Sequence, residues 1–163
     1  MLELLPGTYE VTAVVPDFTT VEGVEVGQEV KAKFLQNWEW ALRGGQVWVE
    51  VGQRITVTKE DQGERSVWVV TCPRGGRLEL TLSRKKYPVG GEEWLVEDIF
   101  EGGRIRTEVW GKRVGQEVWK KRCEDTILLD ADKALVWEEQ KMFTVEEVEV
   151  TGSRVIRTRR VEV

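Results

Sequence analysis

A chain of 163 residues is long enough to bury a core of its own, and 40% hydrophobic with 33% charged residues is typical of a folded globular protein. Its 24 basic and 29 acidic residues give a net charge of −5, so it lacks the basic excess of duplex-binding proteins, and we expect no nucleic-acid partner. The absence of histidine removes the commonest general base and the commonest zinc ligand. We expect a single domain over residues 1–163.

The sequence indicates neither secretion nor a membrane span. No apolar run approaches the ~20 residues that a transmembrane helix needs, and the start, MLELLPG, has no basic region and no long apolar segment. Cys72 and Cys123 lie outside any CxxC pair, which indicates free thiols. We therefore expect a cytoplasmic protein. Abundant Val, Glu and Arg with few Asn, Gln and Met are typical of a heat-adapted (thermophile) chain.

The first predicted elements are a strand and a helix. LLPGTYEV opens with a turn at Pro6 and Gly7 and continues as strand-like sequence. A strand remains the alternative for residues 26–34, where apolar residues alternate. The run QEVKAKFLQNWEWALRGG nevertheless favours a short helix near residues 28–43, because Gly44 suits a C-cap and four apolar residues share one helical stripe: Val30, Phe34, Trp38 and Leu42.

Short strand-like runs separated by turn signals fill most of the remaining chain. Paired glycines such as those at 90–91 and 102–103 mark turns, and the runs between them are rich in Val, Thr, Trp and Ile. RLELTLS places Leu78, Leu80 and Leu82 on one face, and RIRTEVW repeats the alternation. The even spacing predicts an all-β fold, an antiparallel up-and-down barrel of about 8–10 strands.

The last stretch, VEEVEVTGSRVIRTRRVEV, indicates a hairpin with its turn at residues 152–154. Pairing across that turn sets Glu149 opposite Arg157 and Glu147 opposite Arg159, and opposite charges across strands favour this register. We expect one charged face and one largely apolar face on this ribbon.

Few residues suggest chemistry. Asp130 and Asp132 form a D-x-D that can bind a divalent cation, but a hairpin turn with solvated side chains explains the pattern better. Pairs of glutamates suit solvated strand faces, and Cys72 has no histidine to activate it. The glycine pairs lack the spacing of a phosphate-binding loop. We predict no catalytic residue, no metal site and no cofactor, and a protein that is not an enzyme.

The two ends of the chain resemble one known group. LLPGTYEV resembles the first strand of the calycins, the fatty-acid-binding-protein and lipocalin group of up-and-down barrels, with its Gly-x-aromatic motif. The tail RTRRVEV resembles the final strand of the fatty-acid-binding branch, where Thr-Arg-x-Tyr is typical. The resemblance implies that Tyr9 is the barrel-closing aromatic, where tryptophan is usual, and that Arg159, after Thr158, packs over it. Val161 stands where that branch has a tyrosine that helps hold a ligand carboxylate.

A barrel of this size has room for a small ligand, and a buried arginine can pair with a ligand's acid group. We therefore expect non-enzymatic binding or carriage of a small hydrophobic ligand, either a fatty acid or a flat pigment such as a tetrapyrrole. The expected ligand-binding residues are four cavity-lining tryptophans and two arginines of the tail: Trp38, Trp68, Trp94, Trp110, Arg157 and Arg159.

Two other functions stay open. A structural or assembly protein, such as a phage or virion component or another homo-oligomer, has a barrel filled by its own side chains. A tunnel-type phosphohydrolase lines its lumen with glutamates, lysines and arginines around a metal, although its Glu-x-Glu-x-Lys signature is missing here. The charged ribbon at 147–159 discriminates between them, because it points into the lumen of a tunnel and to solvent in a carrier or an assembly protein.

Overall fold

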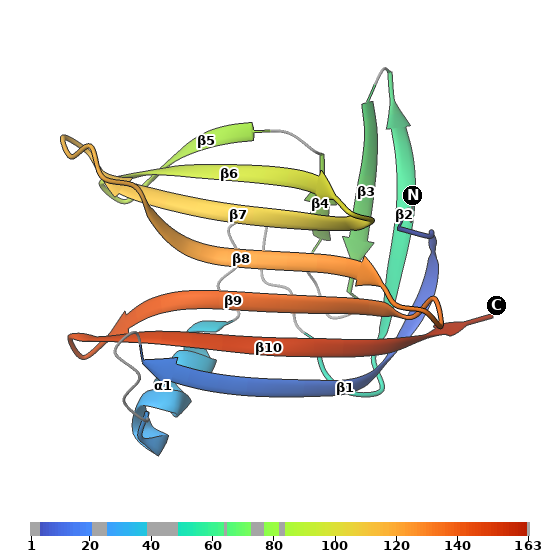
Figure 1. The fold of residues 1–163 in the computed structure, drawn as a ribbon, viewed down its shortest axis with the longest axis horizontal. Coiled ribbons are helices and arrows are strands. Elements are labelled where there is room, and N and C mark those ends of the chain that lie inside the picture. The colour runs from blue at the N-terminus through green and yellow to red at the C-terminus, as the bar shows by residue number, and fades with distance from the viewer. Residues whose placement is uncertain are drawn as a thin grey trace.

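The fold is that of a computed structural model, which describes residues 4–20, 26–38, 49–63, 65–72, 77–81 and 84–162. These residues form one sheet of ten antiparallel strands and a single helix (Figure 1). The elements in chain order are β1 (Gly7–Thr20), α1 (Gln28–Trp38), β2 (Arg54–Gln62), β3 (Arg65–Thr71), β4 (Arg77–Leu80), β5 (Arg84–Val89), β6 (Glu92–Glu101), β7 (Arg104–Arg113), β8 (Lys120–Leu129), β9 (Leu135–Val145) and β10 (Val148–Val161). The predicted all-β, antiparallel up-and-down fold with one short helix is confirmed.

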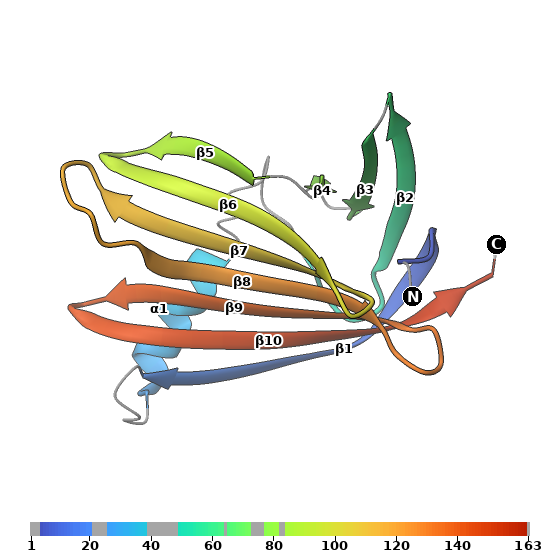
Figure 2. The same cartoon turned by 45° about the horizontal axis from the view of Figure 1, so that its top comes forward.

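The sheet curls without closing. Its strand order is β4-β3-β2-β1-β10-β9-β8-β7-β6-β5, so neighbours in the chain are neighbours in the sheet, and the first and last strands pair. The exceptions among the described strands are β4 and β5, which follow each other in the chain but form the two edges. The result is a half-barrel with its opening between β4 and β5 (Figure 2). The edge strand β5 exposes Lys85, Lys86 and Pro88, residues that discourage further pairing.

A bulge in β1 accompanies the bend that curls the sheet. Residues Thr8–Thr20 pair with β10, and the first four residues of the strand also pair with β2. The register of the β1–β10 pairing shifts between Val11 and Ala13, and a bulge of this kind bends a strand. Figures 1 and 2 show β2 and β3 running steeply across the direction of β5–β10.

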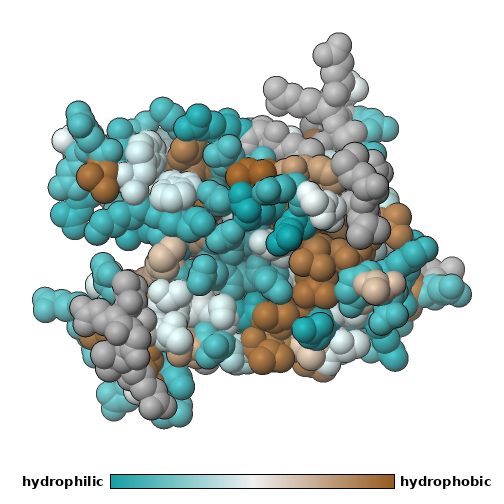
Figure 3. Space-filling model, viewed as in Figure 1, coloured by the Kyte–Doolittle hydropathy of each residue, from teal (hydrophilic) through white to brown (hydrophobic). Residues whose placement is uncertain are grey.

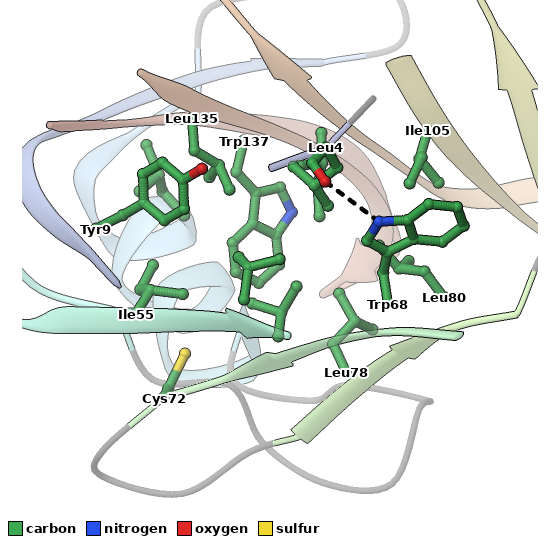
Figure 4. Packing of buried hydrophobic residues seen from close by; sticks show 14 of the residues in the cluster. Leu4, Tyr9, Ile55, Trp68, Cys72, Leu78, Leu80, Ile105, Leu135 and Trp137 are labelled. Atoms are coloured by element: carbon green, nitrogen blue, oxygen red, sulfur yellow. Dashed lines mark hydrogen bonds between the residues drawn. The ribbon is translucent and has the colours of Figure 1, made fainter. Parts of the chain in front are cut away.

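Side chains alternate between an inner, concave face and an outer face. The inner face holds the main apolar cluster, where β1–β4 meet β7–β10 (Figure 4). Its largest fully buried side chains are those of Trp137, Tyr9, Ile55 and Leu80. Each such side chain contributes about 1.5–3 kcal/mol when it leaves water, which makes this cluster the main source of stability. The described members are Leu4, Tyr9, Val11, Val49, Ile55, Val57, Trp68, Val70, Cys72, Leu78, Leu80, Ile105, Ile127, Leu129, Leu135, Trp137 and Ile156.

The first and last strands meet at a seam, but with a different arginine from the one expected. Tyr9 is fully buried and pairs in register with Arg160, whereas Arg159 pairs with Glu10 on the outer face. A shift of one residue places a side chain on the opposite face, so Arg159 does not pack over Tyr9. Arg160 instead donates a hydrogen bond from Nη2 to the carbonyl oxygen of Pro6 (3.0 Å). Its guanidinium lies 3.2 Å from where a Cβ on Gly7 would be, so a larger residue at this position would have to displace the exposed arginine.

The predicted hairpin turn at residues 152–154 is wrong. The chain turns at Glu146 and Glu147, and Val145 pairs with Val148, so TGS lies in the middle of β10. Both glutamates have positive φ, 50° and 64°, as a two-residue hairpin turn of this type requires. Sequence reasoning missed the turn because glycine or asparagine usually fills these positions.

The helix α1 packs against the ends of β1, β9 and β10. Val26 and Val30 lie in a small apolar cluster with Val145 and Val150, and Lys33 forms an ion pair with Glu146. The helical interpretation of the stretch is confirmed over Gln28–Trp38, and the predicted residues 39–43 lie outside the described ones. None of the described helical residues belongs to a helix long and apolar enough to cross a membrane.

Candidate functional site

A row of polar side chains crosses the inner face of five neighbouring strands. Asp98 on β6 pairs in register with Thr107 on β7, which pairs with Asp125 on β8. Asp125 pairs with Glu139 on β9, and Glu139 pairs with Arg154 on β10. These five residues, here called the polar row, lie between apolar residues at the positions two before and two after them on most strands.

The polar row is a buried network. The side chains of Asp98, Thr107 and Glu139 are 7%, 4% and 4% exposed. Thr107 Oγ1 donates to Asp98 Oδ1 (2.7 Å), and Arg154 Nε donates to Glu139 Oε2. Lys141, one inner position further along β9, is also buried. Because burying an unpaired charge costs several kcal/mol, such a cluster persists only when its charges are matched.

On one side of the polar row lies the apolar cluster. Two of its polar atoms are satisfied by backbone: Tyr9 Oη donates to the carbonyl oxygen of Leu5 (2.6 Å), and Trp68 Nε1 donates to that of Leu4 (3.3 Å). Trp137 Nε1 is buried and has no hydrogen-bond partner within the described part of the chain. Figure 4 shows its ring nitrogen on the side that faces Leu4 and Trp68. An unmade buried hydrogen bond costs about 1–3 kcal/mol.

On the other side of the polar row the inner face is less tightly covered. Cys123, Phe143 and Phe18 are half-buried there, next to the end of the sheet where α1 packs. In the space-filling view the left side of the molecule is hollowed between the upper and the lower strands, and hydrophobic residues gather mainly in the right half (Figure 3). The accessible part of the inner face is therefore the part between the polar row and α1.

Neither cysteine is an activated nucleophile. Burial raises the pKa of the Cys72 thiol to about 11, with Glu139 raising it further and Arg154 lowering it. Burial raises the pKa of Cys123 to about 12, with the carboxylate of Asp125 as the next largest cause. Both side chains carry free thiols, as predicted, and they stay protonated at neutral pH.

The structure separates the six residues expected to bind a ligand. Trp68 and Trp94 lie on the inner face on opposite sides of the polar row, and Trp94 Nε1 donates to Glu92 Oε2 (2.9 Å). Trp110 lies on the outer face, where its Nε1 donates to Glu108 Oε2 (3.0 Å) and the Lys121 ammonium sits over its ring. Arg157 and Arg159 are exposed on the outer face, and Arg159 pairs with Glu10. The side chain of Trp38 lies outside those described.

The residues that sequence reasoning missed are those of the polar row, with Lys141 and Trp137. The sequence favoured a solvated strand face for the charged residues among them, because strands of an antiparallel sheet often alternate polar and apolar residues. The available signal was the alternation of faces along a strand: in LVWEEQKMFTV, Glu139 and Lys141 are an even number of residues from Leu135 and Trp137, and therefore share their face. A charged pair in phase with the buried positions of its strand indicates inner, not outer, charges.

The D-x-D sequence forms a turn. Asp130 Oδ1 accepts hydrogen bonds from the backbone N–H groups of Asp132 (3.0 Å) and Ala134 (2.9 Å), as predicted for a hairpin connection. Among the residues with described positions, no three of the Asp, Glu and Cys side chains are grouped so as to hold a metal ion.

Comparisons with the known protein families and with the curated proteins find no match for this chain.

Proposed function

We propose that the half-barrel binds and carries a small amphipathic ligand, a fatty acid or a flat pigment such as a tetrapyrrole, without catalysing a reaction. The observation that carries the proposal is the polar row, which sets buried charges directly beside the apolar cluster on the inner face. Binding sites for such molecules combine an apolar wall with a few convergent polar groups.

The inner cations support one orientation of the proposed ligand. Lys141 and Arg154 are inner-face cations on neighbouring strands: Lys141 pairs in register with Gly152, two residues before Arg154 on β10. A ligand carboxylate pairs with such groups through charge-assisted hydrogen bonds, and its apolar part then lies against inner-face residues such as Phe143 and Trp137.

Calorimetric titration of the full chain with oleate and with biliverdin tests this proposal. We expect one of the two to bind, and Lys141→Met to weaken that binding at least tenfold, since it removes an inner cation while keeping an apolar stem of similar length. Arg157→Met is the matched control: it removes a cation from the outer face of β10, and we expect affinity to change by less than twofold. Equal effects of the two variants, or binding of neither ligand, would contradict the proposal.

Native mass spectrometry of the protein from the cells that make it supplies the ligand's identity. An adduct of a few hundred daltons supports carriage. A clean unliganded chain in every preparation counts against it.

An assembly role is the second candidate, and the dense apolar cluster favours it, because Tyr9, Ile55, Leu135 and Ile156 are 0% exposed. Val114 and Val118, on the connection between β7 and β8, are 75% and 68% exposed. Light scattering during gel filtration tests this role: an oligomer that Val114→Ser with Val118→Ser dissociates would favour assembly over carriage.

The tunnel-type phosphohydrolase draws less support. Glu147, Glu149, Arg157 and Arg159 of the charged ribbon are exposed, which is the arrangement expected of a carrier or an assembly protein. Arg154 of the same ribbon lies on the inner face beside Glu139, which is the one feature of the ribbon that a tunnel shares.

A further inference from the structure

The edge strand β4 forms a short part of the wall around the apolar cluster. It has four residues and, among the described strands, pairs only with β3. On its outer face Arg77 forms ion pairs with Glu60 and Glu79, but the three side chains are 51%, 43% and 46% exposed. Exposed ion pairs of this kind stabilise little. Ladder bonds to β3 and the inward side chains of Leu78 and Leu80 therefore contribute more to holding β4 than these ion pairs do.

A contact across the opening of the half-barrel fastens the end of β4. The backbone N–H of Thr81, the residue after β4, donates to Asp98 Oδ2 on β6 (3.1 Å). The other oxygen of the same carboxylate accepts from Thr107 Oγ1 on β7 (2.7 Å). Asp98 thus joins the end of β4 to β6, the strand next to the opposite edge, where no ladder bond does so among the described residues. Its own strand is anchored to β7.

The residues behind β4 belong to the apolar cluster. Leu78 and Leu80 point inward and are 5% and 1% exposed, and Leu80 pairs in register with Trp68. Cys72, the residue that follows β3, is 3% exposed in the same cluster (Figure 4). Lifting β4 would uncover these side chains and leave the β5–β10 sheet intact.

We propose that β4 is a gate to the apolar cluster and that Asp98 is its latch. When the bond from Thr81 to Asp98 breaks, β4 lifts away from the opening and uncovers Trp68, so that the apolar part of a guest can contact its ring. That a ligand enters through this gate rests on the proposed function, whereas the opening of β4 is a property of the chain alone.

The labelling rate of Cys72 by a thiol reagent in the absence of any ligand measures the gate. The Cys72 thiol is buried and protonated in the closed form, so modification proceeds from the open form. In Asp98→Ala we expect Cys72 to be labelled about tenfold faster or more, because a charge-assisted hydrogen bond that holds β4 is lost. Mass spectrometry of peptides gives the rate at Cys72 and at Cys123 separately, and the Cys123 rate should change by less than twofold.

Two further variants separate a gate from a general loss of stability. Thr107→Val removes the hydrogen bond of Asp98 that lies within the β6–β7 pair and keeps the bond to Thr81, so Cys72 labelling should stay within about threefold of the wild-type rate. Leu78→Ala loosens β4 without touching Asp98 and should accelerate Cys72 labelling selectively, which keeps the test usable if Asp98→Ala does not fold. Acceleration of both cysteines in parallel with the drop in urea midpoint, or no acceleration of Cys72 in either β4-loosening variant, would overturn the gate.

The gate and the carrier fail in different ways. If no ligand binds but Cys72 labelling responds to Asp98 and Leu78 as described, the gate stands and the carrier falls. If oleate or biliverdin binds with rates that Asp98→Ala leaves unchanged, and Cys72 labelling is also unchanged, the carrier stands and the gate falls.

Discussion

At the scale of single residues, the position of a charge relative to the sheet decides what it does. Glu139 and Arg154 form an ion pair on the inner face with side chains 4% and 13% exposed, whereas Glu10 and Arg159 form one on the outer face with side chains 27% and 68% exposed. The outer pair is screened by water and contributes between 0 and about 1 kcal/mol. Removing one partner of the inner pair leaves a buried charge and costs about 3–5 kcal/mol.

The buried thiol of Cys72 makes the protein sensitive to alkali. Its pKa is raised from 9.0 to about 11 in the folded chain, so the folded state keeps the proton at a pH where the unfolded state loses it. Below pH 9 this group leaves the free energy of unfolding unchanged. Between about pH 9 and 11 the free energy of unfolding falls by about 3 kcal/mol.

Urea unfolding of the wild type and of Cys72→Ala at pH 8, 9, 10 and 11 checks this. We expect the variant to be less stable at pH 8, because a small cavity forms, but to lose less stability as the pH rises. Parallel curves for the two proteins would show that Cys72 does not contribute to the alkaline loss. That loss would then belong to Cys123, whose pKa burial raises to about 12, and to Tyr9, whose pKa burial also raises.

At the scale of elements, the turn between β9 and β10 stands out for its residues. Glu146 and Glu147 both adopt a left-handed conformation, which costs a residue with a side chain about 1–2 kcal/mol. Glu146 is held by its ion pair with Lys33 of α1. Glu147 is exposed at the same turn, so it carries conformational strain that a glycine would relieve.

We expect Glu147→Gly to raise the free energy of unfolding by about 0.5–1 kcal/mol, the relief of strain less the extra entropy of an unfolded glycine. Urea denaturation measures the change. Gly103→Ala, at the β6–β7 turn with a φ of 79°, is the matched control and should destabilise by a similar amount. A destabilised Glu147→Gly variant would indicate that the glutamate makes a contact more valuable than the strain it carries.

The elements themselves could be predicted from the sequence, whereas their pairing could not. Alternation in RIRTEVW marks β7 because one face of that strand is buried, and the helical stripe marks α1. The turn at 152–154 was misplaced because glycine is a local signal, while the register that buries Gly152 depends on β1, which is more than 130 residues away in the chain. For the same reason the polar row stayed hidden: Asp98 and Arg154 belong to one row only after five strands are aligned.

At the scale of the whole molecule, each strand pairs with the next one along the chain, and the last strand pairs with the first. The exception among the described strands is the step from β4 to β5. The first and last strands lie side by side, with Thr8 paired with Val161, and β4 and β5 are joined in sequence without pairing in the described structure. The continuity of the sheet therefore runs through the seam of the first and last strands, and the covalent link between β4 and β5 contributes the least to it.

A circular permutant tests this view. In this permutant, residue 163 is joined to residue 1 by a short Gly/Ser linker, and the chain is opened between residues 82 and 83. Every strand can still pair with the same neighbours as in the original chain. We expect this protein to fold, with an unfolding free energy within about 1–2 kcal/mol of the original, since loop closure depends weakly on length. A second permutant, opened between Gly102 and Gly103, breaks a tight hairpin and should lose more, as urea denaturation will measure. If the permutant opened between residues 82 and 83 were the less stable of the two, the β4–β5 connection would not be the least important one.

The exposed strand β5 also matters for how the protein behaves when it is concentrated. Among the described strands, β5 pairs with β6 on one side only. The open edge of such a strand offers its backbone N–H and C=O groups to a second copy, and repeated pairing of that kind produces aggregates. Lys85 and Lys86 bring like charges together when two such strands approach, and Pro88 has no N–H to donate. The sheet can therefore stay open on this side without polymerising, and acetylation of the two lysines would remove much of that protection.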